Sequence, residues 1–534
     1  MSANIAQHRV PVSMRKYDYI GWFVATGAFV ASVIAFAVTL ASGTMLAYSD
    51  AISHMEIARR VVAGSEPDLA QLGGVWLPLP HVLMLPFVWI DPLYQSGIAD
   101  AIVSMAAFVL SCWLLYKIGK QLTASKLAGV AAAVVFGLNV NVLYMQSTPM
   151  TELLLFVTLL LVVYCLQLWV DRRRYVYLAG AGVAGIASAL TRYESWIILA
   201  VLGVIAVVVA WQQSVTIHSM GARTRYARDR IIFFGGLLVI SPLFWVVWNW
   251  ALFGDAFAFQ DGEYAKPSLW LSNHEPAIGN LALSAKVYTL AVLHNIPLPL
   301  VVMACVGVVL FVIKEMVIGR FAARSLIAPS LLVIVPFFIA ALYTGQRPLH
   351  VMEVNQDLYN TRFGLIVILP VAIFAGYLVS YFKYTVLRSV VCTAVVVATL
   401  VTSGLWLQSG DIVALRDPQL ALASSNDTDE FAAADFLKAH YDSGDILMEG
   451  FGNERITFAL PSQHEIYEGT NNANRWNLSL AHPAAHNIKW VVTRCNPQSS
   501  DKVCKQIVAH PDTVDGFTLV YNQRNYRVYK LTNG

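Results

Sequence analysis

A polar segment with an early acidic residue follows the first long apolar stretch of the chain. It runs from Tyr48 to Arg60 and carries Asp50, His54 and Glu56. A carboxylate that is hydrogen-bonded to a hydroxyl group can accept its proton as the oxygen forms a new bond. Asp50 is therefore the candidate general base, and it is also a candidate ligand for a divalent cation.

The residues after Asp50 predict a short surface helix. Ser53 and Glu56 have the spacing of a capping box, and Gly64 is suited to end the helix. Asp50 then lies just ahead of the helix cap. His54 and Glu56 become candidates for orienting a substrate, although a histidine in such a place more often has a structural role.

Two arginines lie in the segment 345–362. Arg362 belongs to the stretch Tyr359-Asn-Thr-Arg-Phe-Gly364, and Arg347 precedes it. The fixed fork of donors on a guanidinium group suits a phosphate. We expect Arg362 to bind a phosphate and Tyr359 to lie beside the substrate. Arg347 either shares the phosphate role or anchors the chain at the membrane interface.

Further charged residues mark the ends of two other apolar runs. Arg192 is followed two residues later by Glu194, and Glu152 opens another run. Because charges near a membrane are costly, we expect Arg192 to line an anionic site, and Glu194 to be its partner or a substrate ligand. Glu152 is either a substrate ligand or a carboxylate favoured by the dipole at a helix start.

An apolar stretch at 71–87 is interrupted by three prolines, Pro78, Pro80 and Pro86. So many prolines make a straight spanning helix improbable, because each lacks a backbone N–H group. The stretch is predicted to be kinked and to lie in the membrane interface. Its Trp76 and His81 are further candidates for contact with a substrate.

The elements that must hold these residues are membrane helices. Of the 534 residues, 57% are hydrophobic and 13% are charged, whereas soluble domains have about 25% charged residues. The net charge of +3 does not indicate a nucleic-acid partner. Eleven apolar runs approach the roughly 20 residues of a membrane span. They lie near 20–41, 98–116, 127–143, 150–170, 175–191, 196–212, 231–250, 288–313, 326–344, 363–382 and 389–407.

Lysine and arginine concentrate in alternate connections between these runs. The basic ends and connections include Arg9, Arg15 and Lys16 before the first run and the Arg172-Arg-Arg174 cluster after the fourth. By the positive-inside rule the N-terminus is cytoplasmic, in the plasma membrane. The loops 42–97, 251–287 and 345–362 and the tail are then extracytoplasmic.

The expected outer loops are long and hold the candidate residues. No glycine-rich nucleotide-binding motif is found in the chain, and no ATP is expected outside the cell. A group-transfer reaction there would need a donor that was activated beforehand, most simply on a lipid.

The composition changes after residue 407. Residues 1–407 form the predicted membrane domain, and residues 408–534 are predicted to form a small extracytoplasmic α/β domain. A helix is predicted over 431–440, strands over 445–449 and 488–493, and a final hairpin over 517–530. Cys495 and Cys504 lie in this domain, either as a disulfide or as two free thiols.

These features resemble the GT-C superfamily of membrane glycosyltransferases, especially the bacterial branch near protein O-mannosyltransferases and the lipid A aminoarabinose transferase. The resemblance rests on Asp50 after the first span, on the basic and aromatic loop 42–97 and on residues 359–364. It covers roughly the whole membrane part. Many members have two acidic residues together at the position of Asp50. Here Ser49 and Ala51 flank it, so the resemblance does not extend to an acidic pair for a metal.

The resemblance implies a membrane all-α bundle and an inverting glycosyltransferase. Such enzymes take a sugar from a polyprenyl-phosphate donor on the outer face, and the acceptor is a lipid, a glycan or a protein. The competing class is a transporter or lipid flippase, but the charges lie at the outer ends of the runs and no internal repeat is found. A non-catalytic membrane scaffold is the third alternative.

Overall fold

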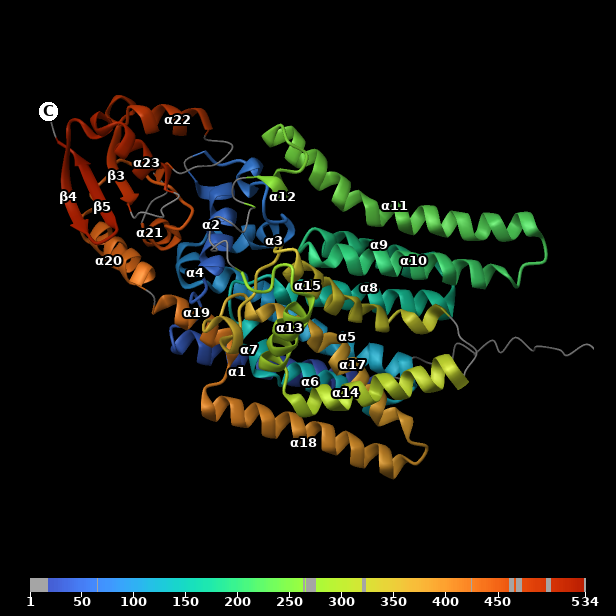
Figure 1. The fold of residues 1–534 in the computed structure, drawn as a ribbon. Coiled ribbons are helices and arrows are strands. Elements are labelled where there is room, and N and C mark those ends of the chain that lie inside the picture. Colours follow the sequence, from blue (N-terminus) through green and yellow to red (C-terminus); the bar gives the residue numbers. More distant parts are fainter. Residues whose placement is uncertain are drawn as a thin grey trace, which may run out of the picture.

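The computed structural model describes residues 18–64, 66–262, 265, 275–318, 323–423, 425–460, 465–466, 473–495 and 501–532. The helices form an elongated bundle, and a small domain with a β-sheet lies at one end of it (Figure 1). The basic residues Arg9, Arg15 and Lys16 lie outside the described residues.

Twelve helices make up most of the bundle. They are α1 (Tyr19–Ala41), α5 (Ile98–Thr123), α6 (Lys126–Gly137), α8 (Glu152–Arg172), α9 (Tyr175–Ala189), α10 (Glu194–Ser214), α11 (Met220–Phe253), α13 (Leu281–Asn295), α14 (Leu298–Phe311), α15 (Ile334–Tyr343), α17 (Ile368–Tyr381) and α18 (Thr385–Ser409). Within the described part of the chain, eight helical stretches are long and apolar enough to cross a membrane. The expected membrane all-α bundle is confirmed.

The eight helical stretches of the described residues are fewer than the eleven predicted runs. Three of the runs, at 127–143, 175–191 and 326–344, contain the shorter helices α6, α9 and α15. The run at 288–313 is divided, because α13 ends before Pro297, which lacks a backbone N–H group. The run at 127–143 is divided by Asn139, whose side chain caps the next short helix, α7 (Val140–Met145). Apolar composition alone did not reveal these breaks.

Two helices form the interior of the bundle. In the most apolar part of α8, 78% of residues are buried, and the figure is 94% for the stretch Thr361–Tyr381, which contains α17. In α1 and α11, which lie at the periphery, only 17% of the residues in the most apolar part are buried. The interior helices begin at the end of the bundle next to the C-terminal domain (Figure 1). Their first turns are therefore fixed by packing from several sides.

The helix that carries Asp50 begins earlier than predicted. This helix, α2, covers Ser49–Ala63 and ends at Gly64 as expected. The Ser53 hydroxyl donates to the carbonyl of Ser49 at 3.2 Å, so Ser53 does not cap the helix. The helix is also not a surface helix, because α3 (Leu79–Val88) and the 3-10 helix η1 (Leu69–Leu72) pack against it. Capping-box spacing was a misleading signal here.

The proline-rich stretch at 71–87 forms a short helix rather than a straight span, as predicted. Pro78 and Pro80 lie at the start of α3, where the missing N–H groups would have no helical partner. Pro86 lies inside α3. A further short helix, α4 (Asp91–Ser96), leads into α5.

The C-terminal domain has the predicted helix and strands. Its sheet has the order β2-β1-β3-β5-β4, with β1 parallel to both neighbours and β4 and β5 forming an antiparallel hairpin. The strands are β1 (Asp445–Leu447), β2 (Glu465–Ile466), β3 (Ile488–Arg494), β4 (Phe517–Gln523) and β5 (Tyr526–Leu531). The helices include α19 (Val413–Leu422), which leads into the domain, α20 (Ser425–His440), α21 (Glu454–Ala459), α22 (Ala473–Ala481) and α23 (Lys502–Ala509). Cys495 and Cys504 form a disulfide, which decides between the two alternatives.

Close packing of α14 against α17 gives a test of the bundle. A Cβ atom at Gly307 would lie 2.0 Å from the backbone oxygen of Phe374. We expect Gly307→Ala to destabilise the protein by about 1 to 3 kcal/mol, because the two helices must separate. A Cβ atom at Gly404 on α18 would have no neighbour within 4 Å, so Gly404→Ala is the control. Thermal unfolding in detergent should show a lower Tm for Gly307→Ala alone.

Candidate active site

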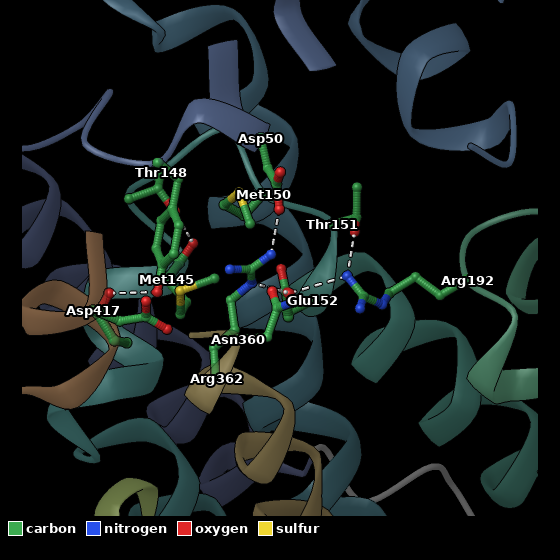
Figure 2. A network of polar contacts seen from close by, with 12 residues as sticks. Asp50, Met145, Thr148, Met150, Thr151, Glu152, Arg192, Asn360, Arg362 and Asp417 are labelled. Atoms are coloured by element: carbon green, nitrogen blue, oxygen red, sulfur yellow. Dashed lines mark hydrogen bonds and ion pairs between the residues drawn. The ribbon is translucent and has the colours of Figure 1, made fainter. Parts of the chain in front are cut away.

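Five charged side chains form a continuous row at the end of the bundle beside the C-terminal domain, and Figure 2 shows four of them. Arg362 bonds to Asp50 through Nη2 and to Oε1 of Glu152 through Nε at 3.2 Å. The same Oε1 accepts from Nη1 of Arg192 at 3.0 Å, and Nη2 of Arg192 donates to Glu194 at 2.9 Å. Three carboxylates thus alternate with two guanidinium groups.

Each acidic member of the row lies in the first turn of a helix. Asp50 belongs to α2, Glu152 to α8 and Glu194 to α10. Helix N-termini carry a partial positive charge and free N–H groups, so carboxylates are favoured there. Arg192 comes from the turn between α9 and α10. Arg362 comes from the 3-10 helix η7 (Thr361–Val367), which leads into α17.

Exposure differs sharply along the row. The side chain of Asp50 is 42% exposed, whereas those of Arg362 and Glu152 are 6% and 5% exposed. The Oε2 atom of Glu152 is buried and has no hydrogen-bond partner among the described residues. Asp50 is therefore the solvent-exposed end of the row, and Arg362 holds it from the buried side.

Aromatic and backbone contacts fix Arg362. Its guanidinium lies 4.5 Å from the centre of the Tyr48 ring, and the Tyr48 hydroxyl donates to the carbonyl of Ala414 at 2.7 Å. The backbone N–H of Thr361 donates to Asp417 at 3.1 Å. These contacts tie η7 to α19, so the position of Arg362 depends on residues that follow the membrane bundle.

Two acidic residues near this site were missed by sequence reasoning. Asp417 is buried in α19, within the region 408–534 that was expected to form a separate domain. Asp100 is buried in the first turn of α5, and its Oδ2 atom has no hydrogen-bond partner in the part of the chain that the structure describes. The only sequence signal for Asp100 was the presence of an acidic residue inside an apolar run.

Arg347 is close to the row but is not part of it. Its guanidinium lies 5.6 Å from the centre of the Tyr193 ring, and this ring stacks on Phe259 at 5.5 Å. Among the described residues, no carboxylate forms an ion pair with Arg347. Arg347 therefore differs from Arg192 and Arg362, whose charges are already compensated by carboxylates.

Tyr359 lies in a segment that a buried histidine holds. It forms a backbone bridge with His350, and their rings are 5.6 Å apart. His350 contacts Glu275 at 3.0 Å through Nε2 and Asp357 at 2.9 Å through Nδ1. These contacts brace the segment just before Arg362.

His54 of α2 forms a separate cluster with His81 of α3 and with Trp76. Nδ1 of His54 lies 2.9 Å from Nε2 of His81, and the ring of Trp76 is 4.3 Å from that of His54. The two histidines are 6% and 0% exposed, so His81 is not at a surface as the interface prediction implied. Burial, with the positive charges of Arg192 and Arg362, lowers the pKa of His54 from 6.5 to about 3. Glu56 on the same helix is also buried.

Metal binding at Asp50 has little support in the geometry. No group of three or more histidine, cysteine, aspartate or glutamate side chains that could hold a metal ion lies among the described residues. The Asp50 carboxylate is instead paired with a guanidinium group. The residues around Asp50 therefore do not make a fitting cation site.

The chain resembles known proteins in fold rather than in sequence. No protein-family model and no curated protein matches the sequence. The archaeal oligosaccharyltransferase AglB from Archaeoglobus fulgidus, in complex with an inhibitory peptide and a dolichol-phosphate, matches with a TM-score of 0.52 at 10% identity. The match covers 89% of this chain and 69% of that chain. The chain shares the overall fold of this membrane protein.

A second solved structure is also similar. ArnT from Cupriavidus metallidurans in the apo state matches with a TM-score of 0.49 at 11% identity, over 93% of this chain and 97% of that chain. The helical membrane bundle with a C-terminal domain that was expected agrees with the fold of AglB. Residue roles at the site remain predictions.

The row of charges predicts a specific cost for losing one arginine. Arg192→Met leaves Glu152 and Glu194 buried without Arg192, and removing one partner of a buried ion pair typically costs about 3 to 5 kcal/mol. We expect Arg192→Met to lower the Tm strongly in detergent, and the double variant Arg192→Met/Glu194→Gln to recover part of the loss. Equal stability of the single and double variants would contradict a coupled row.

The buried histidine pair predicts a dependence of stability on pH. Because the pKa of His54 is about 3 in the folded protein and ordinarily 6.5, its contribution is present above pH 6.5 and is lost as the pH falls below that value. For one histidine the loss is at most about 1.4 kcal/mol per pH unit. Between pH 6.5 and 5, His54→Asn should lose stability less steeply than the wild type. Identical slopes would show that the pKa of His54 is the same in the folded and unfolded protein.

Proposed function

We propose that the protein is an inverting glycosyltransferase that moves a sugar from a polyprenyl-phosphate donor to a hydroxyl group of a lipid, glycan or protein. The observation that carries the proposal is the half-exposed carboxylate of Asp50, fixed by the buried guanidinium of Arg362 at the end of a GT-C bundle. AglB, which has the same fold, was solved in complex with a dolichol-phosphate, and this supports a lipid-phosphate donor.

Asp50 acts as the general base in this proposal. Its Oδ2 is engaged by Arg362, and its Oδ1 has no hydrogen-bond partner among the described residues. Oδ1 can therefore accept the proton of the acceptor hydroxyl as that oxygen bonds to the anomeric carbon. The bond from this carbon to the phosphate oxygen breaks in the same step. A single displacement of this kind inverts the anomeric centre, and polyprenyl phosphate leaves with both electrons of the broken bond.

Arg347 is the first residue to which we assign the donor phosphate. Arg362 and Arg192 are already paired with Asp50, Glu152 and Glu194, whereas Arg347 forms no salt bridge within the described ranges; its side chain lies against the Tyr193 ring and acts on Glu194 only through its charge. A guanidinium without a counter-ion gains most from a phosphate. Arg362 and Arg192 add positive potential from beneath as charge develops on the leaving oxygen.

A bound sugar needs hydrogen-bond acceptors for its hydroxyl groups and aromatic rings for the apolar face of its ring. The Oε2 atom of Glu152, which lacks a partner among the described residues, is a suitable acceptor, because a buried carboxylate oxygen without a hydrogen bond is costly. Tyr359, beside His350, offers a ring near Arg362. His54 and Glu56 are buried residues of α2, and His54 contacts His81 and Trp76, so we assign these four residues to positioning rather than to sugar contact.

The membrane setting follows from the charge pattern. The site lies at the end of the bundle that carries the C-terminal domain, where α2, α3 and α4 are also found (Figure 1). We propose that this end is extracytoplasmic in the plasma membrane, where a lipid can deliver an activated sugar without ATP.

The proposal is tested by replacing Asp50 with asparagine, which keeps the shape and removes the basicity. Because a positioned general base contributes about 10² to 10⁴ in rate, transfer by Asp50→Asn should fall by at least about a hundredfold. Asp91→Asn is the matched control, since Asp91 lies in the same loop but is 67% exposed and pairs with Arg59. Radiolabelled polyprenyl-phosphate sugars with purified protein and a membrane extract give the measurement.

Two outcomes of that assay would overturn the proposal. Near-normal turnover by Asp50→Asn would remove Asp50 as the base. Movement of the labelled lipid across vesicles without transfer would instead favour the transporter or flippase class.

A further inference from the structure

The C-terminal domain touches the segment that leads into the Asp50 helix. Helix α21 packs against α2, and its Arg455 donates from Nη2 to the carbonyl of Ala47 at 3.1 Å and from Nη1 to that of Leu46 at 3.5 Å. Arg455 is 7% exposed. A buried carbonyl needs a hydrogen-bond partner, and here a charged side chain supplies it.

Arg455 is itself held firmly in the C-terminal domain. Its guanidinium lies 4.7 Å from the centre of the Phe431 ring, and its backbone N–H donates to Glu430 at 2.7 Å. One turn further along α21, the ring of Phe458 lies 4.8 Å from that of Tyr94 in α4. The arginine therefore reaches the membrane domain from a rigid support rather than from a free loop.

Two further hydrogen bonds of the segment at 42–48 come from other parts of the chain. Tyr144 donates to the carbonyl of Thr44 at 2.9 Å, and Tyr48 donates to that of Ala414 at 2.7 Å. Neither contact holds the carbonyls of Leu46 and Ala47, which precede Tyr48, the N-cap of α2. The hydrogen bonds from Arg455 thus fix the backbone on which the first turn of α2 is built.

We infer that Arg455 is a positioning residue for Asp50, so that the domain at 408–534 is a working part of the catalytic unit and not only a cover over it. By holding the carbonyls of Leu46 and Ala47, Arg455 sets the start of α2 and keeps the Asp50 carboxylate on Arg362. This inference rests on the proposed function for its catalytic consequence, whereas its structural part can be tested independently.

The structural test is amide hydrogen exchange on the full-length protein in detergent. Within the segment, the N–H groups of Ala47 and Ala51 donate to the carbonyls of Thr44 and Tyr48. In Arg455→Ala, exchange over 44–51 should quicken by about tenfold or more, because a hydrogen bond from a charged group contributes roughly 1.5 to 3 kcal/mol. Strand β3, at the centre of the C-terminal sheet, should keep its wild-type exchange and so report that the domain is folded.

Two further variants make the test specific. Arg455→Lys keeps the charge but replaces the fork with one ammonium group, so its effect should be intermediate. Arg524→Ala is the control, because Arg524 is an exposed arginine that pairs with Asp429 inside the same domain. It should exchange over 44–51 like the wild type.

The catalytic test uses the transfer assay on the same proteins. Arg455→Ala should lower kcat by about tenfold or more with little change in the donor KM, and Arg455→Lys should recover part of the loss. Unchanged exchange over 44–51 in Arg455→Ala overturns the inference whatever the activity. Faster exchange with no transfer even by the wild type supports the structural part and overturns the proposed function instead.

Discussion

The alternation of carboxylate and guanidinium groups from Asp50 to Glu194 is the constraint on which the site depends. A buried charge is stable only when it is paired and hydrogen-bonded, so each member fixes its neighbours. Oε1 of Glu152 accepts from both arginines, which makes it the central atom of the row. The starts of α2, α8 and α10 and the segment before α17 are consequently held in one arrangement.

This arrangement also explains why Asp50 differs from the other acids. Glu152 and Glu194 are interior and serve the arginines, whereas Asp50 stands at the exposed end and shares only one oxygen with Arg362. Burial makes His54 on the same helix a weak base, because its low pKa disfavours protonation of the imidazole. The proposed chemistry is thereby concentrated on one carboxylate.

Much of this architecture could be predicted from the sequence, because hydropathy and charge report directly on membrane burial. The membrane bundle, the strands β3, β4 and β5 and the choice of Asp50, Arg192 and Arg362 as candidates were all accessible in this way. The length of individual helices was not, since Pro297 and the cap at Asn139 divide runs that are continuous in composition. The start of α2 was not predicted either, because Ser53 has capping-box spacing but the helix begins at Ser49.

Contacts between distant parts of the chain were the least predictable. Asp417 binds the backbone beside Arg362, yet nothing around residue 417 distinguishes it from a solvated acid. The bond between Arg455 and Leu46 spans 409 positions in the sequence. A ribosome completes the whole membrane bundle before it adds Arg455. During synthesis the carbonyls of Leu46 and Ala47 therefore lack the hydrogen bonds from Arg455, and the segment before α2 acquires its final contacts only when the last part of the polypeptide has folded.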